Sequence, residues 1–338
     1  MSETLSLEDV HALSKAALIG AGTVETAAEV VAQSITDAEA EGIRNVGLAY
    51  LPIYCRHVSI GKVVGDAVPV VTRTGPSALM ADAGNGFCHP AFTAGEEAFH
   101  ALARENGIAG FGIRHSYASG VIGWFSDRMA RAGLIGMTFT NASAALAPFG
   151  GKKPLFGTNP IAFGVPRRDG PPLVIDQSST ATARINIALK AQAGEPIPEG
   201  WGLDADGNPC TDPNTVLGEG SMAPSGGYKG AAMALLVEIM AGGLTGAKWS
   251  FEASSLGGDE GGPPDIGQFY LAIDPARFGG EGMADRIETL FSAMLEQDGV
   301  RLPGNRRHEN RAKAEAEGVD VPDDLLATLR GYAEGGQG

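Results

Sequence analysis

The order of strand-like and helix-like segments in the first half of the chain restricts the fold more than any other feature. Residues 108–116 (IAGFGIRHS) read as a strand that enters a loop, residues 119–132 as a helix, and residues 134–143 as a second strand. A strand, loop, helix and strand in succession is typical of α/β folds and is compatible with parallel pairing. Further strands are expected over residues 68–83 and 269–275. We therefore predict an α/β fold.

Helices are expected at both ends of the chain. Apolar residues recur at helical spacing over residues 6–19 and 24–40, and again over residues 283–297 and 319–332. The stretch after Gly230 is almost wholly apolar, which predicts a helix that is buried on all sides.

Charge and composition exclude several classes of function. The 338 residues carry a net charge of −15, so nucleic acid and anionic membranes are not expected as partners. No apolar run is long enough to cross a bilayer, and the first residues do not resemble a secretory signal. The 3 cysteines are widely spaced and form no CxxC pair, which argues against disulfides or a zinc site. We expect a cytoplasmic protein without a metal site.

Loops with polar and basic residues mark candidate binding sites. Residues 150–184 contain Lys152-Lys153 and two turn-forming segments, and they are either one edge of a binding site or ordinary surface turns. Gly226-Gly227-Tyr228-Lys229-Gly230 precedes the apolar helix, and a helix N-terminus favours an anion. The loop lacks the spacing of a Walker A motif, and Gly20-Ala21-Gly22 follows a helix, so no Rossmann fingerprint is present.

A second basic cluster lies near the C-terminus. Arg301, Arg306 and Arg307 surround Pro303-Gly304, and guanidinium groups match phosphate oxygens. The cluster is either an anion site or a solvated surface segment. Two separate basic clusters in an acidic chain suggest a ligand with several phosphates, such as a dinucleotide. For proton transfer, His115 and His89 are candidates because both stand in loops next to regular segments.

Several ordered motifs resemble the type 2 malate/L-lactate dehydrogenases, a family of NAD(P)-dependent enzymes. It includes malate, lactate and sulfolactate dehydrogenases and the Δ1-piperideine-2-carboxylate/Δ1-pyrroline-2-carboxylate reductases. The matching segments cover nearly the whole chain: Gly157-Thr158-Asn159-Pro160-Ile161-Ala162-Phe163, Ile175-Asp176, Pro198-Glu199-Gly200-Trp201, Thr211-Asp212-Pro213, Gly226 to Gly230, and Arg301-Leu302-Pro303-Gly304-Asn305-Arg306-Arg307.

The resemblance implies a homodimer with a nicotinamide-binding α/β domain that is not a Rossmann fold and has a mixed sheet. It also implies a mainly helical domain built from both chain ends, which we expect over residues 1–70 with 285–338, the α/β domain covering residues 71–284. By motif, Thr158 would face the substrate. The residues that would line the cofactor are Asp176, Gln177, Ser178, Tyr228, Lys229, Arg301, Arg306 and Arg307. The arginines favour NADP, and NAD remains open.

The turn after the second helix departs from the family pattern. Family members have Ser-His-Gly-x-x-Arg-Leu-Pro here, with histidine as proton donor and arginine on the substrate carboxylate. In this chain Asn45 replaces the serine, Val46 the histidine and Tyr50 the arginine. The second histidine of the family aligns near Ala118, three residues after His115.

The lost histidine favours a substrate that needs no proton from the enzyme. A ketone needs hydride at carbon and a proton at the alkoxide, whereas a cyclic imine can already be protonated. We therefore expect an imino-acid reductase in which Arg44, Asn45 and Tyr50 bind the carboxylate and ring. Two readings stay open. One is a 2-hydroxy-acid dehydrogenase with His115, Tyr50 or Tyr117 as donor, and the other is a cofactor-binding protein without turnover.

Overall fold

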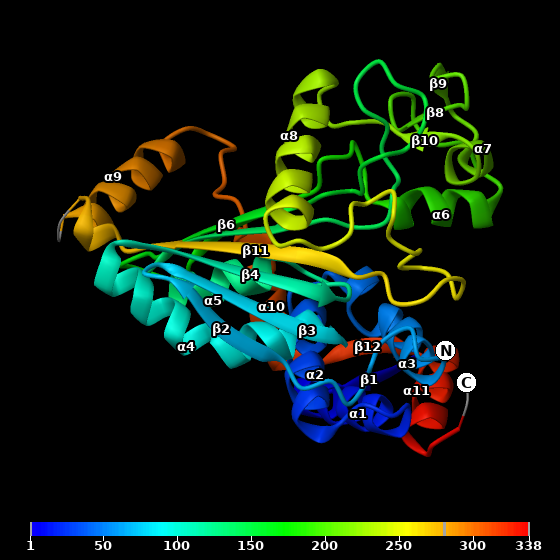
Figure 1. The fold of residues 1–338 in the computed structure, drawn as a ribbon, viewed down its shortest axis with the longest axis horizontal. Helices are drawn as coiled ribbons and strands as arrows, with labels where there is room; N and C mark the ends of the chain where they lie inside the picture. The colour runs from blue at the N-terminus through cyan, green and yellow to red at the C-terminus, as the bar shows by residue number, and fades with distance from the viewer. Residues whose placement is uncertain (1, 280–281, 337–338) are drawn as a thin grey trace.

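The computed structural model describes residues 2–279 and 282–336, and a seven-stranded sheet forms its centre (Figure 1). Its strand order is β2-β3-β4-β11-β5-β6-β7. The strands are β2 (Val70–Gly75), β3 (Ala78–Gly86), β4 (Ile108–Ser116), β11 (Ile266–Ile273), β5 (Ile135–Thr140), β6 (Ile161–Val165) and β7 (Leu173–Gln177).

The sheet is mixed. β3 and β4 pair in parallel, and the other neighbouring strands are antiparallel. β11 comes late in the sequence, yet it lies between β4 and β5 and so prevents them from pairing with each other. The predicted α/β fold with a mixed sheet is confirmed, and the parallel pair occurs one strand earlier than the 108–143 pattern suggests.

One face of the sheet is covered by α4 (Cys88–Asn106) and α5 (Gly123–Arg131) (Figure 1). Aromatic side chains fill this layer: Phe92 and Phe125 pack on Tyr270 of β11. Gly107, with a φ of 84°, ends α4 in the left-handed region that favours glycine. The opposite face carries α8 (Tyr228–Glu238) and the π-helical turn Ile239–Gly243 that continues it.

Both chain ends build a helical part, as the family resemblance implies. It contains α1 (Leu7–Gly20), α2 (Glu25–Ala40), α3 (Leu51–Ser59) and α11 (Asp323–Ala333), and the two termini lie side by side (Figure 1). Ser6 and Asp9 form a complete capping box at the start of α1. The boundaries of residues 1–70 with 285–338 and 71–284 stay a prediction.

A smaller unit follows β7. It has α6 (Arg184–Ala193), α7 (Pro213–Leu217) and the three-stranded sheet β10-β8-β9, formed by Ser221–Met222, Gly202–Leu203 and Pro209–Cys210. Its own small core includes Ile187, Ile197 and Val216.

Three details differ from the sequence predictions. The segment after Gly304 is helical, α10 (Asn305–Glu317), although only Ala314 in it is buried. Residues 319–322 form β12 (Val319–Pro322), which pairs with β1 (Ser2–Leu5), so the last helix starts later than expected. Helix α8 is not buried on all sides, because Leu235 and Leu236 are exposed.

Helix α9 (Met283–Leu295) packs beside β7. Phe291 of α9 forms a small cluster with Leu173 and Leu302. Arg167 and Glu288 pair at 2.8 Å next to this cluster. This packing fixes the position of the loop that leads from α9 to α10 and carries the C-terminal arginines.

Candidate functional site

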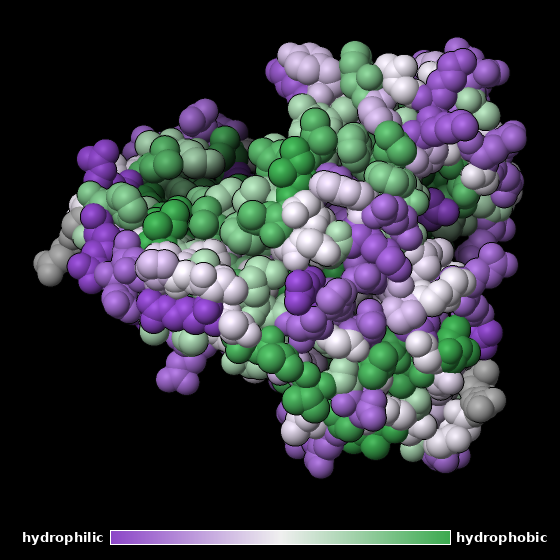
Figure 2. Space-filling view, in the orientation of Figure 1, coloured by the Kyte–Doolittle hydropathy of each residue, from purple (hydrophilic) through white to green (hydrophobic). Residues whose placement is uncertain are grey.

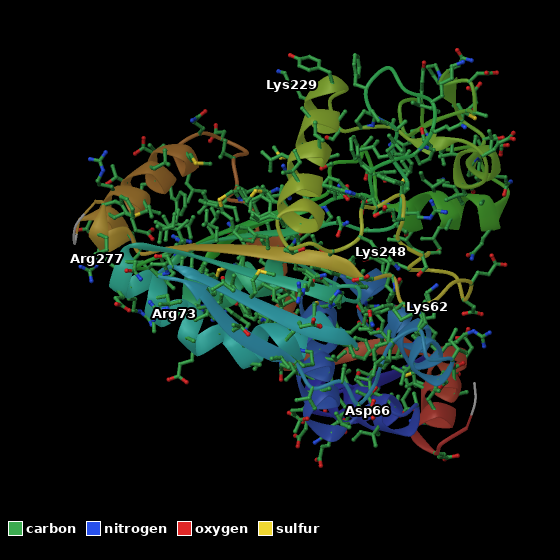
Figure 3. The ribbon with its side chains drawn as sticks, viewed as in Figure 1. Lys62, Asp66, Arg73, Lys229, Lys248 and Arg277 are labelled. Carbon is green, nitrogen blue, oxygen red and sulfur yellow. The ribbon has the colours of Figure 1, made fainter. Side chains whose placement is uncertain are left out.

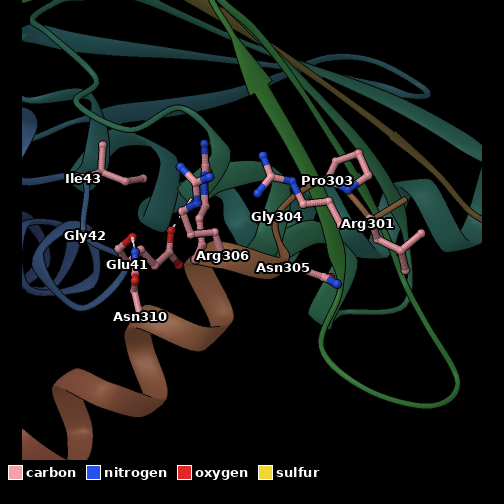
Figure 4. A pocket seen from close by; sticks show the side chains of 11 residues that line it. Glu41, Gly42, Ile43, Arg301, Pro303, Gly304, Asn305, Arg306 and Asn310 are labelled. Carbon is pink, nitrogen blue, oxygen red and sulfur yellow. Dashed lines mark hydrogen bonds and ion pairs between the residues drawn. The ribbon is translucent and has the colours of Figure 1, made fainter. Parts of the chain in front are cut away.

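A pocket of about 490 Å³ lies where the turn after α2 meets the loop before α10 (Figure 4). The turn contributes Glu41, Gly42 and Ile43, and the loop and the first turns of α10 contribute residues 301–307 and Asn310. Asn310 Nδ2 donates to the Glu41 carbonyl at 3.0 Å and joins the two walls. The structure therefore brings the C-terminal arginines to the beginning of the altered N-terminal turn.

The three arginines of this loop differ in what they contact. Arg307 lies 3.8 Å from Asp176 and 4.0 Å from Glu41. Arg301 and Arg306 are accessible at the pocket and have no acidic partner among the described residues. In Figure 4 their side chains stand at the pocket. Two guanidinium groups without carboxylates, in a chain of net charge −15, suit an anionic ligand.

Asp176 is the second-last residue of β7 and reaches the first turn of α5. It accepts the Gly123 N–H at 2.9 Å, and burial raises the pKa of Asp176 while Arg307 opposes that shift. Gln177 is exposed, and Ser178 Oγ is occupied by Thr180. A second, narrow hollow lies beside the main pocket and shares Glu41, Gly304 and Arg307 with it. Of the three predicted residues, Asp176 is placed closest to the arginines.

Thr158 stands on a loop that its neighbours hold rigidly. Its carbonyl accepts the Ser179 N–H at 2.9 Å. The next residue, Asn159, is fully buried and has a φ of 40°. Its side chain donates to Glu238 at 2.6 Å, and its carbonyl accepts the Ser179 hydroxyl at 2.7 Å. Sequence reasoning missed Glu238, because the residue stands at the end of an apolar helix whose pattern predicts only packing.

The altered N-terminal turn is two successive 3-10 turns, Arg44–Val46 and Leu48–Tyr50. Glu39, buried in α2, accepts the Leu48 N–H at 2.7 Å and lies 4.0 Å from Arg44. Burial raises the pKa of Glu39. Asn45 is exposed on this turn, as is the side chain of Arg44, and Val46 is half-buried.

Tyr50 and His115, two predicted proton donors, both have other partners. Tyr50 donates its hydroxyl to the Leu256 carbonyl at 2.7 Å, and burial raises its pKa to about 12. His115 Nδ1 lies 2.8 Å from Asp82, at the end of β4, and the residue has a φ of 49°. The third predicted donor, His89, is buried between Trp124 and Phe125, and burial lowers its pKa to about 4.

A buried histidine–tyrosine pair lies next to the altered turn. The Tyr117 hydroxyl is 2.5 Å from His57 Nδ1, and His57 Nε2 is 3.7 Å from Asp259. Burial lowers the pKa of His57, and the nearby Lys62 adds to the shift. Neutral His57 therefore accepts from Tyr117. The sequence signal for this pair is weak, because its members are 60 residues apart.

Tyr228 and Lys229 lie away from the pocket. They form the first turn of α8, and Figure 3 shows Lys229 at the free end of this helix. Tyr228 is exposed and packs edge to face on Phe149, with ring centroids 6.1 Å apart. Within the described chain, the two residues therefore do not meet the C-terminal arginines.

Metal and membrane sites are not found in the described part of the chain. No group of three or more His, Cys, Asp or Glu side chains there is arranged to hold a metal ion. None of the described helices is both long enough and apolar enough to span a bilayer.

Known proteins resemble the chain along its length. The sequence is 47% identical over 333 residues to a (2R)-3-sulfolactate dehydrogenase (NADP(+)) of Chromohalobacter salexigens, covering 98% of this chain and 99% of that protein. It is 40% identical to a Δ1-pyrroline-2-carboxylate reductase of Ancylobacter novellus, over 96% of both chains.

The fold also matches a solved structure over nearly its whole length. The Δ1-piperideine-2-carboxylate reductase of Pseudomonas syringae superposes with a TM-score of 0.93 and 34% identity, covering 98% of this chain and 99% of the other. The sequence profile described as malate/L-lactate dehydrogenase matches residues 5–330. The chain thus belongs to the malate/L-lactate dehydrogenase family.

Proposed function

We propose that the protein is an NAD(P)H-dependent reductase of a small cyclic imino acid, with Δ1-pyrroline-2-carboxylate or Δ1-piperideine-2-carboxylate as substrate and L-proline or L-pipecolate as product. Relatives named for these reactions are 34–40% identical to the chain, and the reductase of Pseudomonas syringae has nearly the same fold.

One observation carries the proposal: the proton donors expected in the turn region are absent or occupied. Val46 has no proton to give. The Tyr50 hydroxyl donates to the Leu256 carbonyl, and His115, whose Nδ1 is paired with Asp82, lies at the end of β4 and not on this turn. A 2-oxo acid needs a proton at the developing alkoxide. A protonated cyclic imine already carries its proton on nitrogen, and the electron pair of its C=N π bond becomes the lone pair of the amine.

The residues at the pocket fit a phosphorylated nicotinamide cofactor. Arg301 and Arg306 offer guanidinium groups that no described carboxylate occupies, and Arg307, which lies 3.8 Å from Asp176, also lines the pocket. When bound, the cofactor supplies the hydride. NADP is favoured over NAD because a relative 47% identical is named for NADP(+) and because two arginines can meet the additional phosphate.

The substrate carboxylate is assigned to the altered turn. Arg44 supplies a cation there, and Asn45 next to it supplies an amide. Thr158, on its clamped loop, would face the ring. The division into residues 1–70 with 285–338 and 71–284 belongs to the same proposal, because it places the substrate between the helical and the α/β parts.

A substrate panel tests the proposal. Purified protein with NADPH is offered pyrroline-2-carboxylate, piperideine-2-carboxylate, pyruvate, oxaloacetate and 3-sulfopyruvate, and kcat/KM is compared; ureidoglycolate, which is a 2-hydroxy acid, is offered with NADP+ in the oxidative direction. The proposal expects the two imino acids to exceed every oxo acid by at least about tenfold. Faster reduction of any oxo acid would contradict it. Tight NADPH binding without turnover on the whole panel would support a cofactor-binding protein.

A 2-hydroxy-acid dehydrogenase is the second candidate, favoured by the 47% identity to a sulfolactate dehydrogenase. In that case the Tyr117–His57–Asp259 chain is the available proton path. Replacing Tyr117 with Phe would then lower kcat for 3-sulfopyruvate by about 100-fold or more. In the imino-acid reductase the same variant changes kcat much less.

We also propose that two copies of the chain associate. Leu235, Leu236 and Ile239 of α8 and its π-helical continuation are 47%, 44% and 52% exposed. Next to α8, the uncovered face of the sheet has a row of half-buried apolar residues, Met137 and Leu271 among them. Figure 2 shows this hydrophobic surface running from α8 across the sheet. An apolar surface of this kind suits a second copy of the same chain.

A reducing cytoplasm is the proposed location. Cys55 and Cys88 are buried and Cys210 is partly exposed, and all three are free thiols.

A further inference from the structure

We propose that Glu238 is a positioning residue: it holds the loop that carries Thr158, so that Thr158 can contact the substrate. The inference rests on the proposed function, because Thr158 is a substrate residue only in that proposal. Glu238 ends α8, is 3% exposed and has no basic side chain bonded to it among the described residues. A buried carboxylate of this kind is retained only where donors satisfy it.

Three donors from two loops satisfy the Glu238 carboxylate. Asn159 Nδ2 donates to Oε2 at 2.6 Å, and the Ser250 hydroxyl donates to the same oxygen at 2.5 Å. The Ser250 N–H donates to Oε1 at 2.6 Å. Ser250 is fully buried and its carbonyl accepts the Ala144 N–H at 3.0 Å. Glu238 therefore joins the loop that carries Thr158 to the loop that follows the π-helical turn.

The contact with Asn159 determines the backbone next to Thr158. Asn159 has a φ of 40°, a conformation that disfavours most side chains, and its amide is held by Glu238 and by the Ala234 carbonyl at 2.9 Å. On the other side, the backbone of Gly157 is closely packed, because a Cβ there would lie 2.5 Å from the Ala142 carbonyl oxygen. Thr158 stands between these two fixed positions.

The same clamp joins the substrate and cofactor segments. Ser179 donates its hydroxyl to the Asn159 carbonyl at 2.7 Å and its N–H to the Thr158 carbonyl at 2.9 Å. Ser179 directly follows the Asp176 to Ser178 segment assigned to the cofactor. Loss of the Glu238 contact releases Asn159 on one side only, so Thr158 shifts while the cofactor segment keeps its place in β7.

A double-mutant cycle tests the assignment. Glu238→Gln keeps the shape of the side chain but introduces a donor facing three donors, and Thr158→Val removes the hydroxyl that Glu238 is proposed to position. The two single variants and the double variant are compared with the wild type by kcat and KM on the preferred substrate of the panel. NADPH affinity and Tm are measured in parallel.

Glu252→Gln is the matched control, because Glu252 accepts a backbone N–H from Trp249 in the adjacent exposed loop.

The proposal expects Glu238→Gln to lower kcat/KM at least about tenfold relative to the wild type. In the Thr158→Val background, the same substitution is expected to lower kcat/KM less than about threefold. The affinity for NADPH is expected to stay unchanged in all variants. Equal losses in both backgrounds would overturn it, as would a lower Tm with unchanged kcat/KM. The cycle uses whichever substrate the wild type prefers. If that substrate is an oxo acid, the proposed function is contradicted, but the cycle still tests the role of Glu238. If nothing turns over, the cycle is measured as affinity for pyrrole-2-carboxylate in the NADPH complex, with the same expectations.

Discussion

At the scale of single residues, Arg306 and Arg307 are neighbours with different contacts. Arg306 has no acidic partner in the described chain, and Arg307 is held by Asp176 and Glu41. Arg306→Ala removes a charge-assisted bond to phosphate, roughly 1.5–3 kcal/mol, so the Kd for NADPH is expected to rise about 10- to 100-fold. The Kd for NADH changes little if the lost partner is the additional phosphate. Both values come from fluorescence titration.

Arg73 provides the control for this substitution. It lies on the edge strand β2, away from the pocket, and bonds to the Gly75 and Pro76 carbonyls (Figure 3). Arg73→Ala is expected to leave both affinities unchanged. An equal loss of NADPH and NADH affinity in Arg306→Ala would show that Arg306 does not contact the additional phosphate.

His89 makes stability depend on pH. Its pKa is lowered from 6.5 to about 4 because it is buried, and its Nε2 has no partner among the described residues. The unfolded chain therefore binds a proton below pH 6.5 and the folded chain does not. The contribution of neutral His89 to the free energy of unfolding is fully present above pH 6.5 and is lost as the pH drops toward 4. The loss from this residue is about 2 kcal/mol at about pH 5.

Urea unfolding at about pH 7 and about pH 5 measures the effect. His89→Phe keeps the ring between Trp124 and Phe125 and should remove that part of the loss. Burial also lowers the pKa of His57 and His100, so a smaller dependence remains. An unchanged difference between the two pH values in His89→Phe would contradict the assignment.

Part of the residue-scale site could be predicted from sequence. The arginine cluster and Asp176 follow from motifs, and the structure places Arg307 of this cluster 3.8 Å from Asp176. Tyr117 is a candidate donor from the sequence, but its partner His57 and the residue Glu238 do not follow from it, because the contacting residues are distant in the chain, 60 residues apart for Tyr117 and His57 and 79 for Asn159 and Glu238. Local spacing contains no information about such pairs.

At the scale of elements, the loop over residues 254–262 is fastened to α3 and its neighbours. Lys62 is 1% exposed and donates to the Gly258 and Glu260 carbonyls at 2.6 and 2.7 Å. Arg56 pairs with Asp259 on the same loop. This loop also accepts the Tyr50 hydroxyl at Leu256, so it forms one side of the altered turn.

Lys62→Met is expected to loosen this loop. The variant loses two charge-assisted bonds and leaves two carbonyls without their donor, which lowers stability by about 1–3 kcal/mol. Limited proteolysis should then cleave within residues 254–262 faster than in the wild type. Lys313→Met, which removes an exposed lysine from α10, is the control and should cleave as the wild type does. No change in cleavage for Lys62→Met would mean that other contacts hold the loop.

Most elements could be predicted from hydrophobic periodicity, and the exceptions have physical reasons. α10 was missed because it buries only Ala314 and is held by polar contacts, such as Arg311 with Asp37 and Glu41 at 3.0 and 3.1 Å. β12 was read as part of a helix because its partner β1 lies at the opposite end of the chain. The exposed face of α8 could not be distinguished from a buried one, because both are apolar.

At the scale of the whole molecule, α8 has two roles in this account. Its exposed face is proposed to meet a second copy, and its last residue, Glu238, holds the Thr158 loop. Leu236→Glu combined with Ile239→Glu places two charges on the face. The double variant is expected to be a monomer by light scattering, and the wild type is expected to be a dimer. Ile60→Glu, exposed at the end of α3, is the control and should stay dimeric. A wild-type monomer would contradict the proposed association.

The family fold was predicted for the whole chain, whereas the substrate depends on a few positions. The intact motifs build the sheet and the arginine pocket, and the departures at Asn45, Val46 and Tyr50 lie on one short turn. The central claim is that this turn supplies no proton, so that the substrate must bring its own.

The pH dependence of kcat/KM for pyrroline-2-carboxylate tests this claim most directly. It is measured for the wild type and for Tyr50→Phe, Tyr117→Phe and His115→Gln. The account predicts that the rate falls only with the pKa of the free imine, at the same pH in all four proteins. A titrating group that disappears in one of the variants would identify an enzyme proton donor and contradict the account.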